Sequence, residues 1–368
     1  MTALRHLLEL VRAPAALSVP GDVAAGAAAG RALGPRTLGL ACSSVCLYWA
    51  GMAANDWADR HLDAVERPER PIPSGRVSPG TALGVAAGLT AAGLAAAALA
   101  GGRRAMAVAV PLAGAIWAYD LVAKNTRAGP LVMAVCRGLD VLLGATPGPR
   151  MGASGPARGA PPQPRMGASL PAALTVAAHT YLLTHLSRGE TSGTARHRPA
   201  ATLAGTLALA ATTACQPASK ASSRLGKASS RLGEALGHPG EALGHPGQAL
   251  SRPGQALSRP GQALSRPGQA LRHPGEGQYT PLTEATHLAA ITRAVLATWY
   301  ASQFGTEQAR AIANPSAHQV RDAVTAGIVS LPALQGALLA RAGAPRTGLA
   351  LAAVIPLARK LAGKLSPT

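Results

Sequence analysis

The chain has 368 residues, with 35 Lys and Arg against 16 Asp and Glu, which gives a formal charge of +19. Only 14% of the residues are charged and 48% are hydrophobic, a balance that argues against a nucleic-acid-binding protein, in which basic residues cluster on one face. Aromatic residues make up just 3%, so a water-soluble core of this size would lack its usual large fillers. Ala, Gly and Leu supply the apolar mass instead, and small residues let helices pack closely in a bilayer.

Apolar stretches long enough to cross a bilayer, roughly 17 to 25 residues each, recur along the chain. Residues 1–14 precede them and predict a short helix in the membrane interface. The ten candidate spans lie near residues 15–33, 37–55, 80–101, 105–123, 128–146, 170–187, 199–215, 284–304, 322–340 and 344–362. The stretch 284–304 is the weakest, because His287 and Arg293 lie within it and charge is costly inside a membrane. The pattern predicts an all-α integral membrane protein with nine to ten transmembrane helices.

The positive-inside rule favours ten crossings over nine. With a cytoplasmic N-terminus, ten crossings place more of the short-loop Lys and Arg residues on the cytoplasmic side than nine crossings do. We therefore expect a multi-pass protein of the plasma membrane, in which the loop at residues 55–79 is cytoplasmic.

Two low-complexity inserts divide the bundle. Residues 147–171 are rich in Pro and Gly, and residues 216–280 contain the unit G-x-A-L-x-x-P six times at a seven-residue period. A Pro followed by Gly in each unit prevents a helical stripe, so we expect disorder, with an extracellular binding arm as the alternative. The bundle then consists of residues 15–146, 172–215 and 281–368.

Acidic residues are concentrated in the string NDWADRHLDAVERPERPIPSG, which begins at Asn55. Asn55, Asp59 and Asp63 follow one another at intervals of four, which places an amide and two carboxylates on one face of a helix end. Mg2+ binds such oxygens and commonly completes its shell with water and phosphate oxygens. Arg67 and Arg70 come next, and guanidinium groups bind phosphate oxygens in pairs. The string therefore suits a diphosphate better than a merely solvated loop.

The same string resembles the first signature of the UbiA superfamily of intramembrane prenyltransferases. The resemblance implies a UbiA-like helical bundle that transfers a polyprenyl group from its diphosphate to an acceptor, with Mg2+ as cofactor. It further implies that Asn55, Asp59 and Asp63 hold the metal, that Asp59 and Asp63 are catalytic, and that Arg67 and Arg70 bind substrate.

Tyr119 and Lys124 look like the tyrosine and lysine pair that the family carries in its next cytoplasmic loop, where they would bind substrate. The alternative for Lys124 is a loop cation whose side chain extends to the membrane surface.

The family's second signature, a pair of aspartates, should fall in residues 184–199. One acid stands there, Glu190, beside Arg188. Either the two belong to a reduced metal and substrate site, or they form a structural ion pair at a helix end. The string SRGET-x-G and the C-terminal stretches resemble the EboC-like branch of the superfamily, which is associated with secondary metabolism.

Two functions follow from these residues. The first is a membrane prenyltransferase acting on a polyprenyl diphosphate and an unknown aromatic or lipid acceptor. The second is a non-catalytic component that binds or transports a polyprenyl lipid or a metabolite and keeps half of the metal site. We expect no nucleic-acid partner, because aromatic and basic residues do not alternate.

Overall fold

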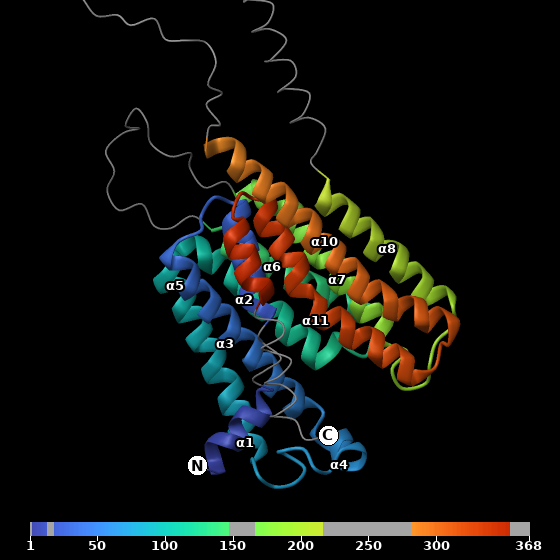
Figure 1. Cartoon of the computed structure of the whole chain (residues 1–368). Helices are drawn as coiled ribbons and strands as arrows, with labels where there is room; N and C mark the ends of the chain where they lie inside the picture. Colours follow the sequence, from blue (N-terminus) through green and yellow to red (C-terminus); the bar gives the residue numbers. More distant parts are fainter. Residues whose placement is uncertain (1, 13–17, 147–165, 216–280, 354–368) are drawn as a thin grey trace, which may run out of the picture. The chain divides into compact units, whose positions relative to one another are not determined.

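The computed structural model describes residues 2–12, 18–146, 166–215 and 281–353, and every regular element in these ranges is helical (Figure 1). The predicted all-α fold class is therefore confirmed for the described part. Residues 1–215 and 285–368 form one compact unit, and residues 216–284 form a second, almost all of which lies outside the described ranges. The seven-residue repeats and most of the first insert also lie outside them.

The helices divide into two halves on either side of the first insert. The first half contains α1 (Thr2–Leu10), α2 (Val19–Ala29), α3 (Pro35–Ala58), α4 (Arg60–Glu66), α5 (Pro79–Ala118), the π-helical turn η2 (Tyr119–Ala123) and α6 (Gly129–Gly144). The second half contains the 3-10 turn η3 (Met166–Ser169), α7 (Leu170–Ser187), α8 (His197–Ala214), α10 (Pro281–Ala313) and α11 (Ala317–Arg341). Residues 345–353 are helical as well.

Local signals in the sequence explain where several of these helices begin. Proline occupies one of the first two positions of α3, α5, α6 and α7, where its missing N–H costs nothing. The Ser78 hydroxyl accepts a hydrogen bond from the Thr81 N–H at 3.1 Å and so caps α5. Ser316 caps α11 in the same way, through the N–H of Gln319 at 3.4 Å.

Helix occupies all ten of the predicted spans in whole or in part. Four helical segments of the described part are long and apolar enough to cross a membrane: Pro35–Ala58, Pro79–Ala123, Met166–Ser187 and Ala317–Arg341. Large apolar side chains such as Leu38 and Leu99 are exposed on their flanks, as expected for surfaces that lipid covers. The count of nine to ten crossings stays a prediction.

Helix α5 is broken at Gly102, between the two spans predicted at residues 80–101 and 105–123. The backbone there has φ 63° and ψ −153°, a conformation that essentially only glycine adopts. Hydrogen bonding makes α5 one continuous element, but it consists of two helices that meet at Gly102. The predicted boundary between the two spans is therefore confirmed as a break in the helix.

Small residues let the helices of the first half approach closely. A Cβ atom on Gly26 of α2 would lie 1.7 Å from the carbonyl oxygen of Val141 in α6, and one on Gly144 would lie 1.9 Å from that of Val23. Such contacts are typical of helix pairs held by packing in a bilayer.

Helix α10, which contains the weakest predicted span, contributes to the interior of the second half. Its Leu296, Tyr300 and Phe304 are buried together with Val324 and Leu334 of α11. Pairing with α11 covers this face of α10, so the helix does not lie isolated on a surface.

Candidate functional site

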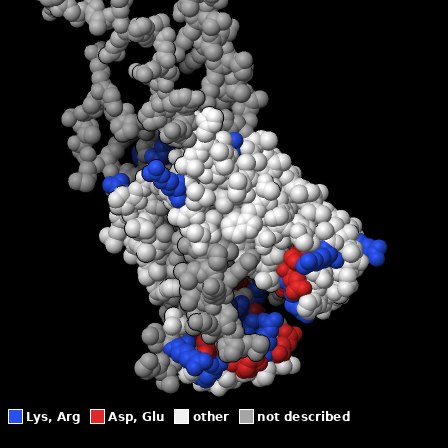
Figure 2. All heavy atoms as spheres, viewed as in Figure 1, with Lys and Arg blue, Asp and Glu red and all other residues white. Residues whose placement is uncertain are grey.

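The end of α3 and the short helix α4 present the acidic string. The N–H of Asp59 donates to the Asn55 carbonyl at 2.9 Å, and the N–H of Asp63 donates to the Asp59 carbonyl at 2.8 Å. The three residues therefore follow one another at one-turn intervals, although Asp59 itself belongs to neither helix. In Figure 2, acidic side chains gather with Lys and Arg over α1 and α4 and over the loops that follow α7 and α10, whereas the helix flanks are almost uncharged.

Lys124, which follows η2, joins two of these residues. Its ammonium nitrogen lies 2.6 Å from Asp59 Oδ1 and 2.9 Å from Asn55 Oδ1. The Asn55 amide also donates to Asp59 Oδ2 at 3.4 Å. Two oxygens from successive turns thus converge on one cationic atom, and Lys124 is folded into the site and is not a free loop cation.

Asp63 belongs to a second cluster centred on Arg70. The Arg70 guanidinium lies 2.5 Å from Asp63 Oδ2 and 3.5 Å from Asp56 Oδ1, and both carboxylates are buried. Arg12 completes the cluster at 2.7 Å from Asp56 Oδ1. The sequence prediction did not include Asp56 or Arg12; Asp56 was visible in the same string, whereas no sequence signal links Arg12 to it. The side chain of Arg67, by contrast, is exposed and makes none of these contacts.

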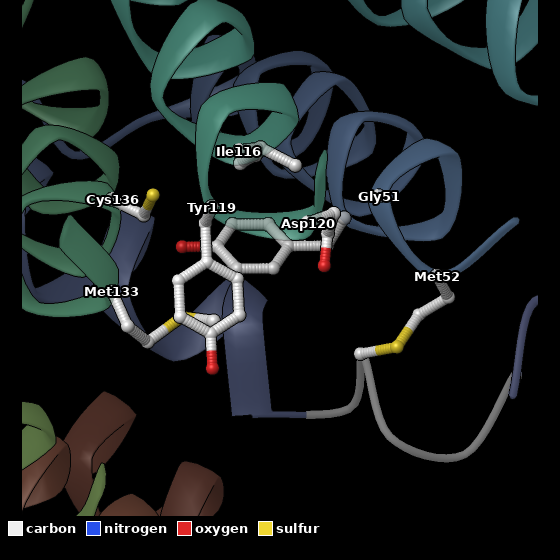
Figure 3. A pocket seen from close by; sticks show the side chains of 8 residues that line it. Gly51, Met52, Ile116, Tyr119, Asp120, Met133 and Cys136 are labelled. Atoms are coloured by element: carbon white, nitrogen blue, oxygen red, sulfur yellow. The ribbon is translucent and has the colours of Figure 1, made fainter. Parts of the chain in front are cut away.

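Tyr119 lines a pocket formed by α3, the end of α5, η2 and α6. The lining residues are Tyr48, Gly51, Met52, Ile116, Tyr119, Asp120, Met133 and Cys136. Figure 3 shows Gly51 and Met52 on one side of the Tyr119 and Asp120 side chains, with Met133 and Cys136 on the other.

The loop after α7 contacts the Lys124 loop through Arg188, which donates to the carbonyl of Thr126. Glu190 is half-buried, and its backbone carbonyl accepts a hydrogen bond from Arg321 of α11 at 2.9 Å. Burial raises the pKa of the Glu190 carboxyl, although the charge of Arg321 opposes this shift. Within the described residues no ion pair joins Glu190 to Arg188, so the structural pairing considered for these two side chains is not found.

No group of three or more His, Cys, Asp or Glu side chains able to hold a metal ion is found among the residues that the structure describes. Asn55 Oδ1 and Asp59 Oδ1 nevertheless converge on the Lys124 ammonium, as hard oxygen ligands converge on a cation. Two protein oxygens suit Mg2+ if water and substrate phosphate complete its shell.

Sequence reasoning also missed a polar set inside the bundle. Asp22 of α2 lies 2.6 Å from Arg137 Nε of α6 and accepts a hydrogen bond from Gln335 of α11 at 2.6 Å. Ser44 of α3 donates to the buried Asp140 of α6. The sequence did contain one signal for this polar set, because its ionisable residues lie within predicted spans. Charged groups are costly inside a membrane and are rarely unpaired there.

Comparisons with known proteins agree with this architecture. Residues 17–215 match the UbiA prenyltransferase family. Digeranylgeranylglyceryl phosphate synthase of Methanopyrus kandleri is 37% identical over 155 residues, which are 40% of this chain and 55% of that protein. The bacteriochlorophyll synthase 33 kDa chain of Rhodobacter capsulatus is 34% identical over 84 residues, 23% of this chain and 27% of that one. The chain thus spans about half or less of the length of these relatives.

One solved structure, described as digeranylgeranylglyceryl phosphate synthase in membranes, has a TM-score of 0.52 and covers 94% of this chain and 100% of its own. At 13% identity this likeness shows the fold alone. None of these matches bears on the EboC-like branch, which stays a prediction.

Proposed function

The chain belongs to the UbiA prenyltransferase family, and we propose that it moves a polyprenyl group from its diphosphate to an acceptor within the membrane, with Mg2+ assistance. The observation that carries the proposal is the convergence of Asn55 Oδ1 and Asp59 Oδ1 on the Lys124 ammonium. The relatives named as synthases of prenylated products support the same reaction class.

Asn55 and Asp59 would hold Mg2+, and Asp63, one turn further along the chain, lies in the neighbouring cluster centred on Arg70. Mg2+, when bound, would neutralise the charge that develops on the leaving diphosphate. Lys124 contacts Asn55 Oδ1 and Asp59 Oδ1, the two oxygens that would hold Mg2+. When these oxygens bind the metal, the Lys124 ammonium can pair with a phosphate oxygen of the substrate instead. Arg70 holds Asp63 in place and offers a planar guanidinium for phosphate oxygens. Arg188 holds the neighbouring loop by its bond to Thr126.

The pocket beside Tyr119 is suited to the reacting end of the prenyl chain. Ile116, Met133 and Cys136 give it apolar walls, and these walls exclude water from the carbon that loses diphosphate. The orientation of the site toward the cytoplasm and the plasma-membrane location belong to the proposal as well.

A non-catalytic polyprenyl-lipid-binding or transport component is the second candidate. It is favoured by the absence, within the described ranges, of a group of three acidic or other metal-binding side chains. Glu190, the one acid in its loop, has its carbonyl bound to Arg321 of α11. Binding without turnover would require only the cationic side chains and the pocket.

Binding of inorganic diphosphate to the purified full chain tests the diphosphate site that both candidate functions require. We expect Mg2+-dependent binding by calorimetry that Asp59→Ala and Asp63→Ala each abolish, because each change removes a carboxylate and little of the helix core. Glu66→Gln is the matched control, since Glu66 is an exposed acid on α4 outside the described ion pairs. Unchanged affinity in both aspartate variants would reject the metal assignment.

A further inference from the structure

Asp120 is an acid in the pocket that neither the acidic string nor the proposed metal site uses. It is 8% exposed and lines the pocket together with Tyr48, whose hydroxyl is buried. Among the described residues the Asp120 carboxylate has no hydrogen-bond or ion-pair partner, and it lines the pocket. A carboxylate without a partner therefore borders a largely apolar cavity, which indicates a polar ligand group that enters it.

The local backbone presents Asp120 to this cavity. The residue lies in η2, and single π-helical turns are frequent at functional sites because they redirect side chains. On the facing helix, a Cβ atom on Gly51 would lie 2.8 Å from Asp120 Oδ2 and 2.6 Å from a methyl carbon of Ile116. The absence of a side chain at Gly51 therefore leaves room for the Asp120 carboxylate.

Asp120 also lies near the proposed diphosphate site. Lys124, which contacts Asn55 and Asp59, follows it by four residues. The charges of Lys124, Asp56 and Asp59 are close enough to act on the Asp120 carboxylate. An acceptor whose polar group enters the pocket would thus meet the reacting end of the prenyl chain beside the leaving diphosphate.

We propose that Asp120 is the general base of the transfer and that the acceptor presents a hydroxyl group. This inference rests on the proposed function. The prenyl C1–O bond breaks and its electron pair leaves with diphosphate. A lone pair of the acceptor hydroxyl oxygen forms the new C1–O bond, and the hydroxyl proton passes to a carboxylate oxygen of Asp120.

The test uses the full chain in lipid nanodiscs, with geranylgeranyl diphosphate as the donor. Geranylgeranylglyceryl phosphate is the hydroxyl probe, and 1,3-dihydroxynaphthalene is a probe that can react at a ring carbon. The variants are Asp120→Asn, Asp120→Glu and the control Glu66→Gln. Products are identified by mass spectrometry, and Mg2+-dependent binding of inorganic diphosphate is measured for each variant.

We expect wild-type transfer to the hydroxyl and a fall in kcat of about 100-fold or more in Asp120→Asn, the usual contribution of a general base. Diphosphate binding should be unchanged, and Asp120→Glu should recover part of kcat. The inference is overturned if Asp120→Asn retains kcat, if it loses diphosphate binding, or if the wild type prenylates only the ring carbon. If the wild type neither binds diphosphate nor forms a product, the proposed function itself fails.

Discussion

Replacing Asp22 with leucine should cost the bundle about 3 kcal/mol. Asp22 is fully buried, and the side chain of its partner Arg137 is 8% exposed, with 2.6 Å between the paired atoms. Removing one member of a buried pair typically costs about 3 to 5 kcal/mol, because the other charge is left uncompensated. The lower figure applies to this pair because the Asp140 carboxylate still acts on Arg137. Gln335 also loses an acceptor.

The assay is equilibrium unfolding in mixed micelles titrated with sodium dodecyl sulfate, followed by helical circular dichroism. The double variant Asp22→Leu with Arg137→Met should recover most of the loss, because apolar side chains replace buried pairs at little cost. Asp322→Asn is the control: its partner His318 is exposed, so a change within about 1 kcal/mol is expected. A loss below about 1 kcal/mol in Asp22→Leu, or no recovery in the double variant, would refute the reasoning.

Two further substitutions test the kink in α5 and the state of Glu190. Gly102→Ala should lower the unfolding free energy by about 1 to 3 kcal/mol through backbone strain alone, since nothing lies within 4 Å of a Cβ atom there. Gly88→Ala, equally open but within regular helix, should raise it by about 0.5 to 1 kcal/mol, and equal effects in the same micelle titration would contradict the kink. Because burial raises the pKa of Glu190, the folded state binds its proton more tightly than the unfolded state does. Stability should therefore fall as pH rises just above the usual Glu range, and this slope should disappear in Glu190→Gln. If Glu190 ligates Mg2+, the same variant should also need more Mg2+ for half-maximal diphosphate binding.

Features that depend on nearby residues could be predicted from the sequence. Apolar length located the helices, and Gly102 separates two predicted spans because a special backbone conformation needs glycine. The spacing of Asn55, Asp59 and Asp63 is local too, since one backbone hydrogen bond links each to the next. Such features need no knowledge of tertiary packing.

The partners of these residues could not be predicted, because they come from distant segments. Asp56 pairs with Arg12, which lies 44 residues earlier, and Lys124 reaches Asn55 from 69 residues later. An apolar pattern indicates which face of a helix is buried but not which helix covers it. The environment of Asp120 depends on Gly51 of another helix in the same way.

The central claim is Mg2+-dependent turnover at the acidic string. The most direct measurement incubates membranes that contain the expressed chain with labelled geranylgeranyl diphosphate and follows both diphosphate release and labelled lipid products. We predict release and product formation that require Mg2+, are lost in Asp59→Ala and persist in Glu66→Gln. Retention of intact geranylgeranyl diphosphate by the wild-type chain, with no release in the presence of Mg2+, would contradict the account and favour a non-catalytic lipid-binding component.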